Sequence, residues 1–220
     1  MYILTLAIGN DYRKCLAKGL QSKKLYAEKH GYTYVQGDES HWDRERPISW
    51  SKVPFLLSWL AKLPENEIVW LSDADVLITN LELRFEEHVL PLFPAGKDML
   101  MTFDSCGHVN AGNIVMKNTP WVRDFWKRVY QQTDVIYHIW WENAGIVKLM
   151  EKNESDREKI AITLEHKRFN AYLMGLPGQP LWEPGDFLVH FAGIYTPEKF
   201  RDLINEIEKG GVPRLSMFNE

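Results

Sequence analysis

The sequence is short of cysteine and of long apolar runs. Its two cysteines, Cys15 and Cys106, are too few and too isolated for a disulfide scaffold or a zinc site, so we expect both to be reduced and structural. No uninterrupted apolar stretch approaches the roughly 18 residues of a membrane-spanning helix. The N-terminal YILTLAIGN is typical of a strand and a polar turn rather than of a signal peptide. A cytoplasmic location is therefore expected, with a Golgi or secretory one left open if the chain is an excised domain.

Positive charge is also in short supply. The net charge of −4 argues weakly against nucleic acid as the main partner, because a surface that follows phosphates is normally basic. The densest basic groups are Arg13-Lys14 and Lys23-Lys24, which stand at helical spacing. We expect these residues to form a solvated helix face.

A glycine-rich loop is missing from the start of the chain. Enzymes that make nucleotide sugars usually show a G-x-G-T-R-like loop after the first strand, whereas here that strand ends in IGNDYRK. Repeats, low-complexity tracts and linkers are absent as well. With 220 residues, 45% of them hydrophobic and 25% charged, the composition predicts a single soluble domain over residues 1–220.

What the sequence does contain is an alternation of strand and helix patterns in its first half. The alternation favours an α/β fold with a mostly parallel sheet flanked by helices, in which ligands bind beyond the carboxyl ends of the strands. We expect strands at residues 3–8, 32–35, 68–71, 99–103, 113–116 and 187–191. We expect helices at residues 11–30, 51–62, 120–131, 139–150 and 197–209.

The stretch VWLSDADVLITN carries the clearest chemical signal. It places Asp73 and Asp75 one residue apart, just past a hydrophobic strand. A bend after the strand lets both carboxylates reach one cation, and such hard oxygen ligands suit Mg²⁺ or Mn²⁺ holding a diphosphate. The alternative is a pair of turn or capping aspartates.

A histidine near the end of a late apolar strand gives the second signal. His190 lies in DFLVHFAG, and such a histidine is more often a satisfied core residue. Imidazole is also a good ligand for Mn²⁺, and Gly193 close behind would let the backbone approach a phosphate.

Three further stretches have both a functional and a structural interpretation. The N-A-G-N of residues 110–113 offers amide donors to a hydroxylated ligand, or forms a plain turn. Glu142 and Asn143 begin a predicted helix, where they either cap it or face a reactive carbon. Lys52 also stands at a helix start and either reaches a phosphate or lies on the surface.

The order of these motifs resembles the galactosyl- and xylosyltransferases of glycosyltransferase family 34, over roughly residues 3–195. The motifs, in order, are SKKLYAxxHGY at 22–32, WSK at 50–52, WLSDAD at 70–75, NAG at 110–112, WENA at 141–144 and HFAG at 190–193. The resemblance implies the GT-A fold.

The resemblance also implies roles for particular residues. Asp73, Asp75 and His190 match metal ligands for Mn²⁺ or Mg²⁺, and Glu142-Asn143 aligns with an Asp-Gln pair beside the anomeric carbon. The implied contacts to the nucleotide sugar are Ile8, Asn10, Lys52, Ala74, Asn110, Ala111, Gly112, Gly193 and Lys199. Two of these matches depart from the family. Asn143 is one methylene shorter than glutamine, and Lys199 stands in for a lysine that follows the late motif in the family.

The implied function is transfer of a sugar, with retained configuration, from a nucleotide sugar to a carbohydrate hydroxyl. UDP is the default donor base of the family, and guanosine stays open. The expected partners are the nucleotide sugar and a glycan or glycoconjugate acceptor, without nucleic acid or a membrane span. Two alternatives are kept: a non-catalytic nucleotide-sugar or glycan-binding module of the same fold, and a nucleotidyltransferase that makes nucleotide sugars.

Overall fold

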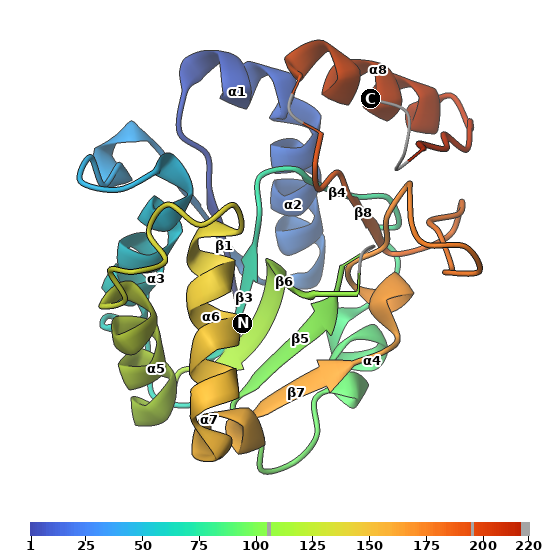
Figure 1. The fold of residues 1–220 in the computed structure, drawn as a ribbon. Helices are drawn as coiled ribbons and strands as arrows, with labels where there is room; N and C mark the ends of the chain where they lie inside the picture. Colours follow the sequence, from blue (N-terminus) through green and yellow to red (C-terminus); the bar gives the residue numbers. More distant parts are fainter. Residues whose placement is uncertain (105–106, 195, 217–220) are drawn as a thin grey trace.

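A six-stranded sheet forms the centre of the fold, which a computed structural model describes for residues 1–104, 107–194 and 196–216 (Figure 1). The order across the sheet is β2-β1-β3-β6-β5-β7. The strands are β1 Tyr2–Leu6, β2 Thr33–Gly37, β3 Ile68–Ser72, β5 Met99–Phe103, β6 Val109–Lys117 and β7 Ile160–Thr163. Cys106, predicted to be reduced, lies outside the described residues, and Cys15 is a free thiol.

One strand of this sheet runs against the others. β1 pairs in parallel with β2 and β3, and β7 pairs in parallel with β5, whereas β6 is antiparallel to both of its neighbours. The expected α/β fold with a mostly parallel sheet is therefore confirmed. The reversal of β6 has a direct consequence for the site. Ser72, at the carboxyl end of β3, pairs with Asn113 in the middle of β6, so residues 110–112, which precede it, lie beside the Asp73–Asp75 turn.

A second, two-stranded sheet continues from that turn. It consists of β4 Val76–Ile78 and β8 Leu188–His190, which pair antiparallel with Val76 opposite His190. This pairing brings a residue from late in the chain beside the two aspartates. The sequence analysis predicted β8 but not β4, because three residues are too few to show an alternating pattern.

Helices cover both faces of the central sheet. They are α1 Asn10–Cys15, α2 Ala17–His30, α3 Lys52–Leu60, α4 Phe85–His88, α5 Pro120–Tyr130, α6 Trp141–Lys152, α7 Glu154–Lys159 and α8 Pro197–Glu208. Short 3₁₀ helices occur at Glu39–His41, Ile48–Ser51, Leu90–Leu92 and His166–Arg168. No helix among these is long and apolar enough to cross a membrane, in the part of the chain that the structure describes.

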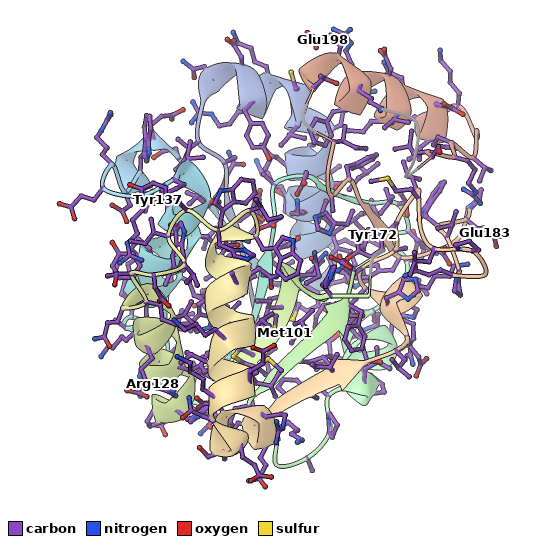
Figure 2. The ribbon with its side chains drawn as sticks, viewed as in Figure 1. Met101, Arg128, Tyr137, Tyr172, Glu183 and Glu198 are labelled. Carbon is purple, nitrogen blue, oxygen red and sulfur yellow. The ribbon has the colours of Figure 1, made fainter. Side chains whose placement is uncertain are left out.

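Side chains that alternate along each strand divide the core into two layers. Along β3, Val69 and Leu71 pack with residues of α3, α5 and α6, whereas Trp70 faces the other layer, which contains residues of α2 and α4. Met101 of β5 belongs to the first layer and lies near α6 (Figure 2). A third cluster joins α8 to the beginning of α2 and to β8, and α8 lies beside α1 (Figure 1).

Several predicted boundaries differ from the structure. The single helix expected over 11–30 is broken at Leu16, which caps both α1 and α2 with a non-helical backbone. The N-A-G-N stretch, whose structural interpretation was a plain turn before a strand, lies inside β6. The sequence analysis also missed β7 and α7. These two elements are only four and six residues long, so their periodicity is hard to recognise.

Candidate active site

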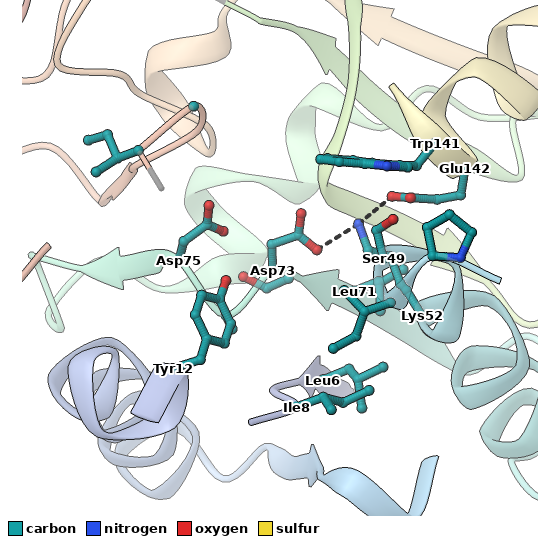
Figure 3. A pocket seen from close by; sticks show the side chains of 16 residues that line it. Leu6, Ile8, Tyr12, Ser49, Lys52, Leu71, Asp73, Asp75, Trp141 and Glu142 are labelled. Carbon is teal, nitrogen blue, oxygen red and sulfur yellow. Dashed lines mark hydrogen bonds and ion pairs between the residues drawn. The ribbon is translucent and has the colours of Figure 1, made fainter. Parts of the chain in front are cut away.

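A cavity of about 560 Å³ opens beyond the carboxyl ends of β1 and β3 (Figure 3). Its floor includes apolar residues of these strands, among them Leu6 and Leu71, and Ile8 just after β1. Lys52 of α3 and Glu142 of α6 line one side, and the Asp73–Asp75 turn lines the other. The location is the one that parallel α/β sheets use for ligands.

Asp73, Asp75 and His190 meet at this turn. One oxygen of each carboxylate and one ring nitrogen of His190 lie within 4.8 Å of one another. The Nε2 atom of His190 lies 3.4 Å from Oδ1 of Asp75. Two carboxylates and an imidazole suit a divalent ion such as Mn²⁺, and the approach of His190 from a distant strand makes simple turn capping an incomplete account of the aspartates.

A hydrogen-bond chain fixes which nitrogen of His190 faces the aspartates. It starts at the indole N–H of Trp70, which can only donate and lies 2.9 Å from Oδ1 of Asn113. The amide nitrogen of Asn113 then donates to Oδ1 of Asn170 at 2.9 Å. That same oxygen lies 2.9 Å from Nδ1 of His190, so Nδ1 carries the proton. In the neutral ring the lone pair is therefore on Nε2, toward Asp75.

The two aspartates differ in their electrostatic surroundings. Burial raises the pKa of Asp73 to about 6, although Lys52 acts to lower it. Burial also acts to raise the pKa of Asp75, but the nearby His190, followed by Lys23, more than offsets it and holds the pKa below its usual range. A pair of carboxylates with unequal pKa values is typical of functional sites.

Lys52 links three separate elements around the cavity. Its Nζ lies 2.7 Å from Oδ1 of Asp73, 2.8 Å from Oε1 of Glu142 and 3.3 Å from the carbonyl of Ala111. Burial acts to lower the pKa of Lys52, but Asp73 and Glu142 raise it above its ordinary value. The surface interpretation of Lys52 is wrong, because the residue is 9% exposed. A phosphate would share or replace one of these three partners.

Glu142 and Asn143 were both predicted to lie beside the reacting carbon, but their side chains have different neighbours in the structure. Glu142 lines the cavity and is 4% exposed, and its second oxygen, Oε2, has no hydrogen-bond partner. Asn143 is not among the lining residues, and its amide nitrogen donates to the carbonyl of Val109 at 2.6 Å. In this arrangement Asn143 fastens the start of β6 to α6.

The backbone of the N-A-G stretch, residues 110–112, contacts the cluster formed by Asp73, Asp75 and His190. The amide of Asp73 donates to the carbonyl of Gly112 at 2.7 Å. A Cβ atom on Gly112 would lie 2.1 Å from Cε1 of His190, so this position requires glycine. The side chain of Asn110 accepts from the amide of Gly112 and from Asn170, at 2.8 and 3.0 Å.

The remaining predicted donor contacts divide into two groups. Ile8, Ala74 and Gly193 line the cavity. Asn10 instead lines a separate, shallow hollow and accepts a hydrogen bond from Arg13. Lys199 lies in α8 and is not among the residues that line the cavity.

Two residues at the site were missed or misplaced by the sequence analysis. Tyr12 of α1 lines the cavity near both aspartates, and burial, then Asp75 and Asp73, raise the pKa of its hydroxyl. Lys23 was expected on a solvated face, but it is completely buried. Its position was readable: Lys23 falls in the apolar stripe of Leu16, Leu20 and Ala27, at helical spacing.

Comparison with known proteins agrees with this arrangement. The model of the galactosyl transferase GMA12/MNN10 family matches residues 3–94. An uncharacterized alpha-1,2-galactosyltransferase of Schizosaccharomyces pombe is 24% identical over 92% of this chain and 60% of its own length. A galactomannan galactosyltransferase of Cyamopsis tetragonoloba is 22% identical over 94% of this chain and 50% of its own length. The chain thus spans between half and two thirds of these relatives.

Solved structures show the same fold at low sequence identity. A glycosyltransferase involved in glycosylation of the major capsid of PBCV-1 superposes with a TM-score of 0.72 at 13% identity, covering 93% of this chain and 98% of its own. A galactosyltransferase solved with donor and acceptor sugar analogues gives a TM-score of 0.54 at 12% identity, covering 94% and 96%. The chain therefore has the GT-A glycosyltransferase fold, and it resembles the GMA12/MNN10 galactosyl transferase family.

Proposed function

We propose that this protein is a metal-dependent, retaining glycosyltransferase. It would move a sugar from a nucleotide sugar, with UDP as the expected base, to a hydroxyl group of a carbohydrate or glycoconjugate acceptor. The observation that carries the proposal is the convergence of Asp73, Asp75 and His190 at the edge of the cavity, with ligand atoms within 4.8 Å of one another. The family resemblance and the shared fold support the class of reaction.

The residues present fit a divalent metal ion. Asp73 and Asp75 offer one carboxylate oxygen each, and the His190 nitrogen that carries the lone pair faces them. An imidazole ligand favours Mn²⁺ over Mg²⁺, which takes oxygen ligands almost exclusively. When bound, such an ion would neutralise the negative charge that develops on the departing diphosphate.

The rest of the cavity suits the other parts of a nucleotide sugar. Leu6, Ile8 and Ile48 provide an apolar wall for a flat base. Gly193, with a φ of +79°, brings its backbone to the cavity without a side chain, and the Tyr12 hydroxyl is a donor for phosphate oxygens.

Glu142 is suited to orient the donor sugar rather than to remove a proton. Its Oε1 lies 2.8 Å from the Lys52 ammonium group, so this oxygen is already occupied and is not free to take a proton from a substrate. Its Oε2, buried and unpartnered, is available to a sugar hydroxyl. We therefore assign Glu142 to the donor sugar and Asn143 to holding β6. The acceptor proton would pass to the leaving diphosphate, so no strong protein base is needed when the acceptor attacks from the leaving-group side.

The test is nucleotide release from a panel of UDP- and GDP-sugars, measured with Mn²⁺ and again with EDTA. We expect metal-dependent release from one donor, and its loss in D75N. The matched control is D202N, which changes an exposed aspartate of α8 that forms an ion pair with Arg201. Tight nucleotide binding without release from any donor, even with acceptor sugars present, would favour the non-catalytic binding module. Release that is insensitive to EDTA would contradict the metal assignment.

A further inference from the structure

Lys23 is a completely buried lysine that the proposed reaction does not use, and burial lowers its pKa to about 7 although Asp75 and Asp73 act to raise it. It lies in the first half of α2, is 0% exposed and is not among the residues that line the cavity. Ionised lysines are rarely buried unless several groups replace the water around them. The groups that surround this ammonium group therefore indicate its role.

The ammonium group of Lys23 binds the backbone of the metal-ligand turn. Its Nζ lies 2.8 Å from the carbonyl of Asp73, 2.7 Å from that of Val76 and 3.5 Å from that of Ala74. Asp73 and Ala74 belong to the short connection between β3 and β4, and Val76 is the first residue of β4. An ammonium group has three protons, so this one side chain can donate a hydrogen bond to each of the three carbonyls.

Neighbouring residues of α2 bind the same segment. A Cβ atom on Gly19 would lie 3.0 Å from the carbonyl oxygen of Val76 and 3.4 Å from that of Ala74, so glycine permits the close approach. The hydroxyl of Ser22 accepts from the amide of Ile78 at 3.0 Å. Gly19, Ser22 and Lys23 share one face of the helix because they are three and four residues apart. Residues 73–78 therefore pack against this face of α2.

Charge adds to the effect of the hydrogen bonds. Asp73 and Asp75 place two carboxylates near one point, where they repel each other. Lys52 offsets part of this repulsion by pairing with the side chain of Asp73. Lys23 approaches the same turn through its carbonyls, so in its charged form it adds positive charge without occupying a carboxylate oxygen. The ligand oxygens stay available to a cation.

We propose that Lys23 is a positioning residue of the metal site: by holding the carbonyls of Asp73, Ala74 and Val76, it keeps the two carboxylates turned toward one point. The inference rests on the proposed function, because it assumes that these carboxylates bind a metal. Lys23 itself touches neither the cation nor the substrate. It acts through the shape of the turn, as outer-shell groups do in other metal sites.

The test is Mn²⁺ affinity, measured by the electron paramagnetic resonance signal of free Mn²⁺ during titration of the full chain. K23M replaces the ammonium group with an apolar side chain of similar length. We expect it to weaken Mn²⁺ binding about tenfold or more, as outer-shell changes do. Excess Mn²⁺ should restore part of the nucleotide release. K24M is the matched control, because the neighbouring lysine is exposed and forms an ion pair with Glu28, which is also exposed; the Mn²⁺ affinity of K24M should equal that of the wild type.

A second variant keeps the inference testable if K23M fails to fold, as judged by near-ultraviolet circular dichroism. G19A retains Lys23 but pushes a methyl group against the carbonyl of Val76, and we expect a smaller loss of Mn²⁺ affinity. Unchanged affinity in a folded K23M, or in G19A where K23M is unfolded, would overturn the inference while leaving the metal site intact. Absence of Mn²⁺ binding by the wild type would instead overturn the proposed metal site, and the inference with it.

Discussion

The two parts of the chain contribute unlike groups to the site. Residues 1–94 form the parallel strands β1, β2 and β3 and supply the charged groups Asp73, Asp75 and Lys52. The part after residue 94 contains the reversed strand β6 and supplies His190, the Gly112 carbonyl and Glu142. The family model matches only the first part, residues 3–94.

This difference shows how the cluster of Asp73, Asp75 and His190 is assembled from distant parts of the chain. The two carboxylates are neighbours in the sequence, so one turn brings them together. His190 reaches them only through the antiparallel pairing of β8 with β4, and Gly112 only through the pairing of β6 with β3. Under the proposed function, the first part would define where a cation binds, and the second part would complete the ligand set and add Glu142, the residue proposed to orient the donor sugar.

The largest expected effect comes from removing a charged ligand of the first part. D75N keeps the size of the side chain but removes its charge, so donor release should fall by roughly a hundredfold or more, as it does when other groups that stabilise developing charge are removed. Thermal stability without metal should fall near neutral pH, because the surroundings that hold the pKa of Asp75 below its usual range stabilise its charged form in the folded protein. Full activity of D75N in an assay with Mn²⁺ would show that donor release does not need the charge of Asp75.

Removing the ligand of the second part should have a smaller effect of a different kind. H190A leaves both carboxylates in place but deletes the only nitrogen of the ligand set. Mn²⁺ affinity should fall, and the preference for Mn²⁺ over Mg²⁺ should narrow, because only oxygen ligands are left. Isothermal titration with both ions measures this, with H41A as a matched control at a part-exposed histidine. An unchanged preference would mean that His190 is not a ligand.

The hydrogen-bond chain between the two parts gives the third prediction. N170L removes the acceptor for His190 and leaves the buried amide of Asn113 without its partner. We expect a loss of about 1–3 kcal/mol in the free energy of unfolding, together with about tenfold weaker Mn²⁺ binding. Urea denaturation and Mn²⁺ titration measure the two quantities. A variant that loses stability but binds Mn²⁺ normally would show that the chain has no part in orienting the imidazole.

The smallest expected effect on metal binding is that of E142Q. The amide keeps the shape of the carboxylate but weakens the contact with Lys52, so nucleotide release should fall by about tenfold while Mn²⁺ affinity stays close to that of the wild type. Steady-state kinetics at saturating Mn²⁺, beside a direct titration, separate the two. A large loss of Mn²⁺ affinity would move Glu142 from the donor sugar to the metal site.

In both parts of the chain, the strands with a plain apolar run could be predicted from the sequence. Asp73 and Asp75 follow such a strand in the first part, and the strand 99–103 of the second part was placed with both ends correct. His190 was found through its own late strand. The partner strand Val76–Ile78 was missed, because three apolar residues after a turn carry no periodicity of their own.

Other features depend on tertiary contacts that no local pattern encodes. The burial of Lys23 follows from the close approach of α2 to the turn, and a lysine in an apolar stripe was the only sign of it. Asn143 was predicted beside the reacting carbon from the family resemblance, whereas in the structure its side-chain amide on α6 donates to the carbonyl of Val109 on β6. The role of Asn143 beside the anomeric carbon, and the roles of Asn10 and Lys199 in donor binding, stay predictions.

The most direct test of the metal-ligand group is a crystal structure of the protein with Mn²⁺ and UDP, with data collected at the manganese absorption edge. An anomalous peak within coordination distance of Asp73, Asp75 and His190 would show that both parts of the chain hold one ion. A peak elsewhere in the cavity, or one within coordination distance of the aspartates but not of His190, would contradict the proposed ligand set.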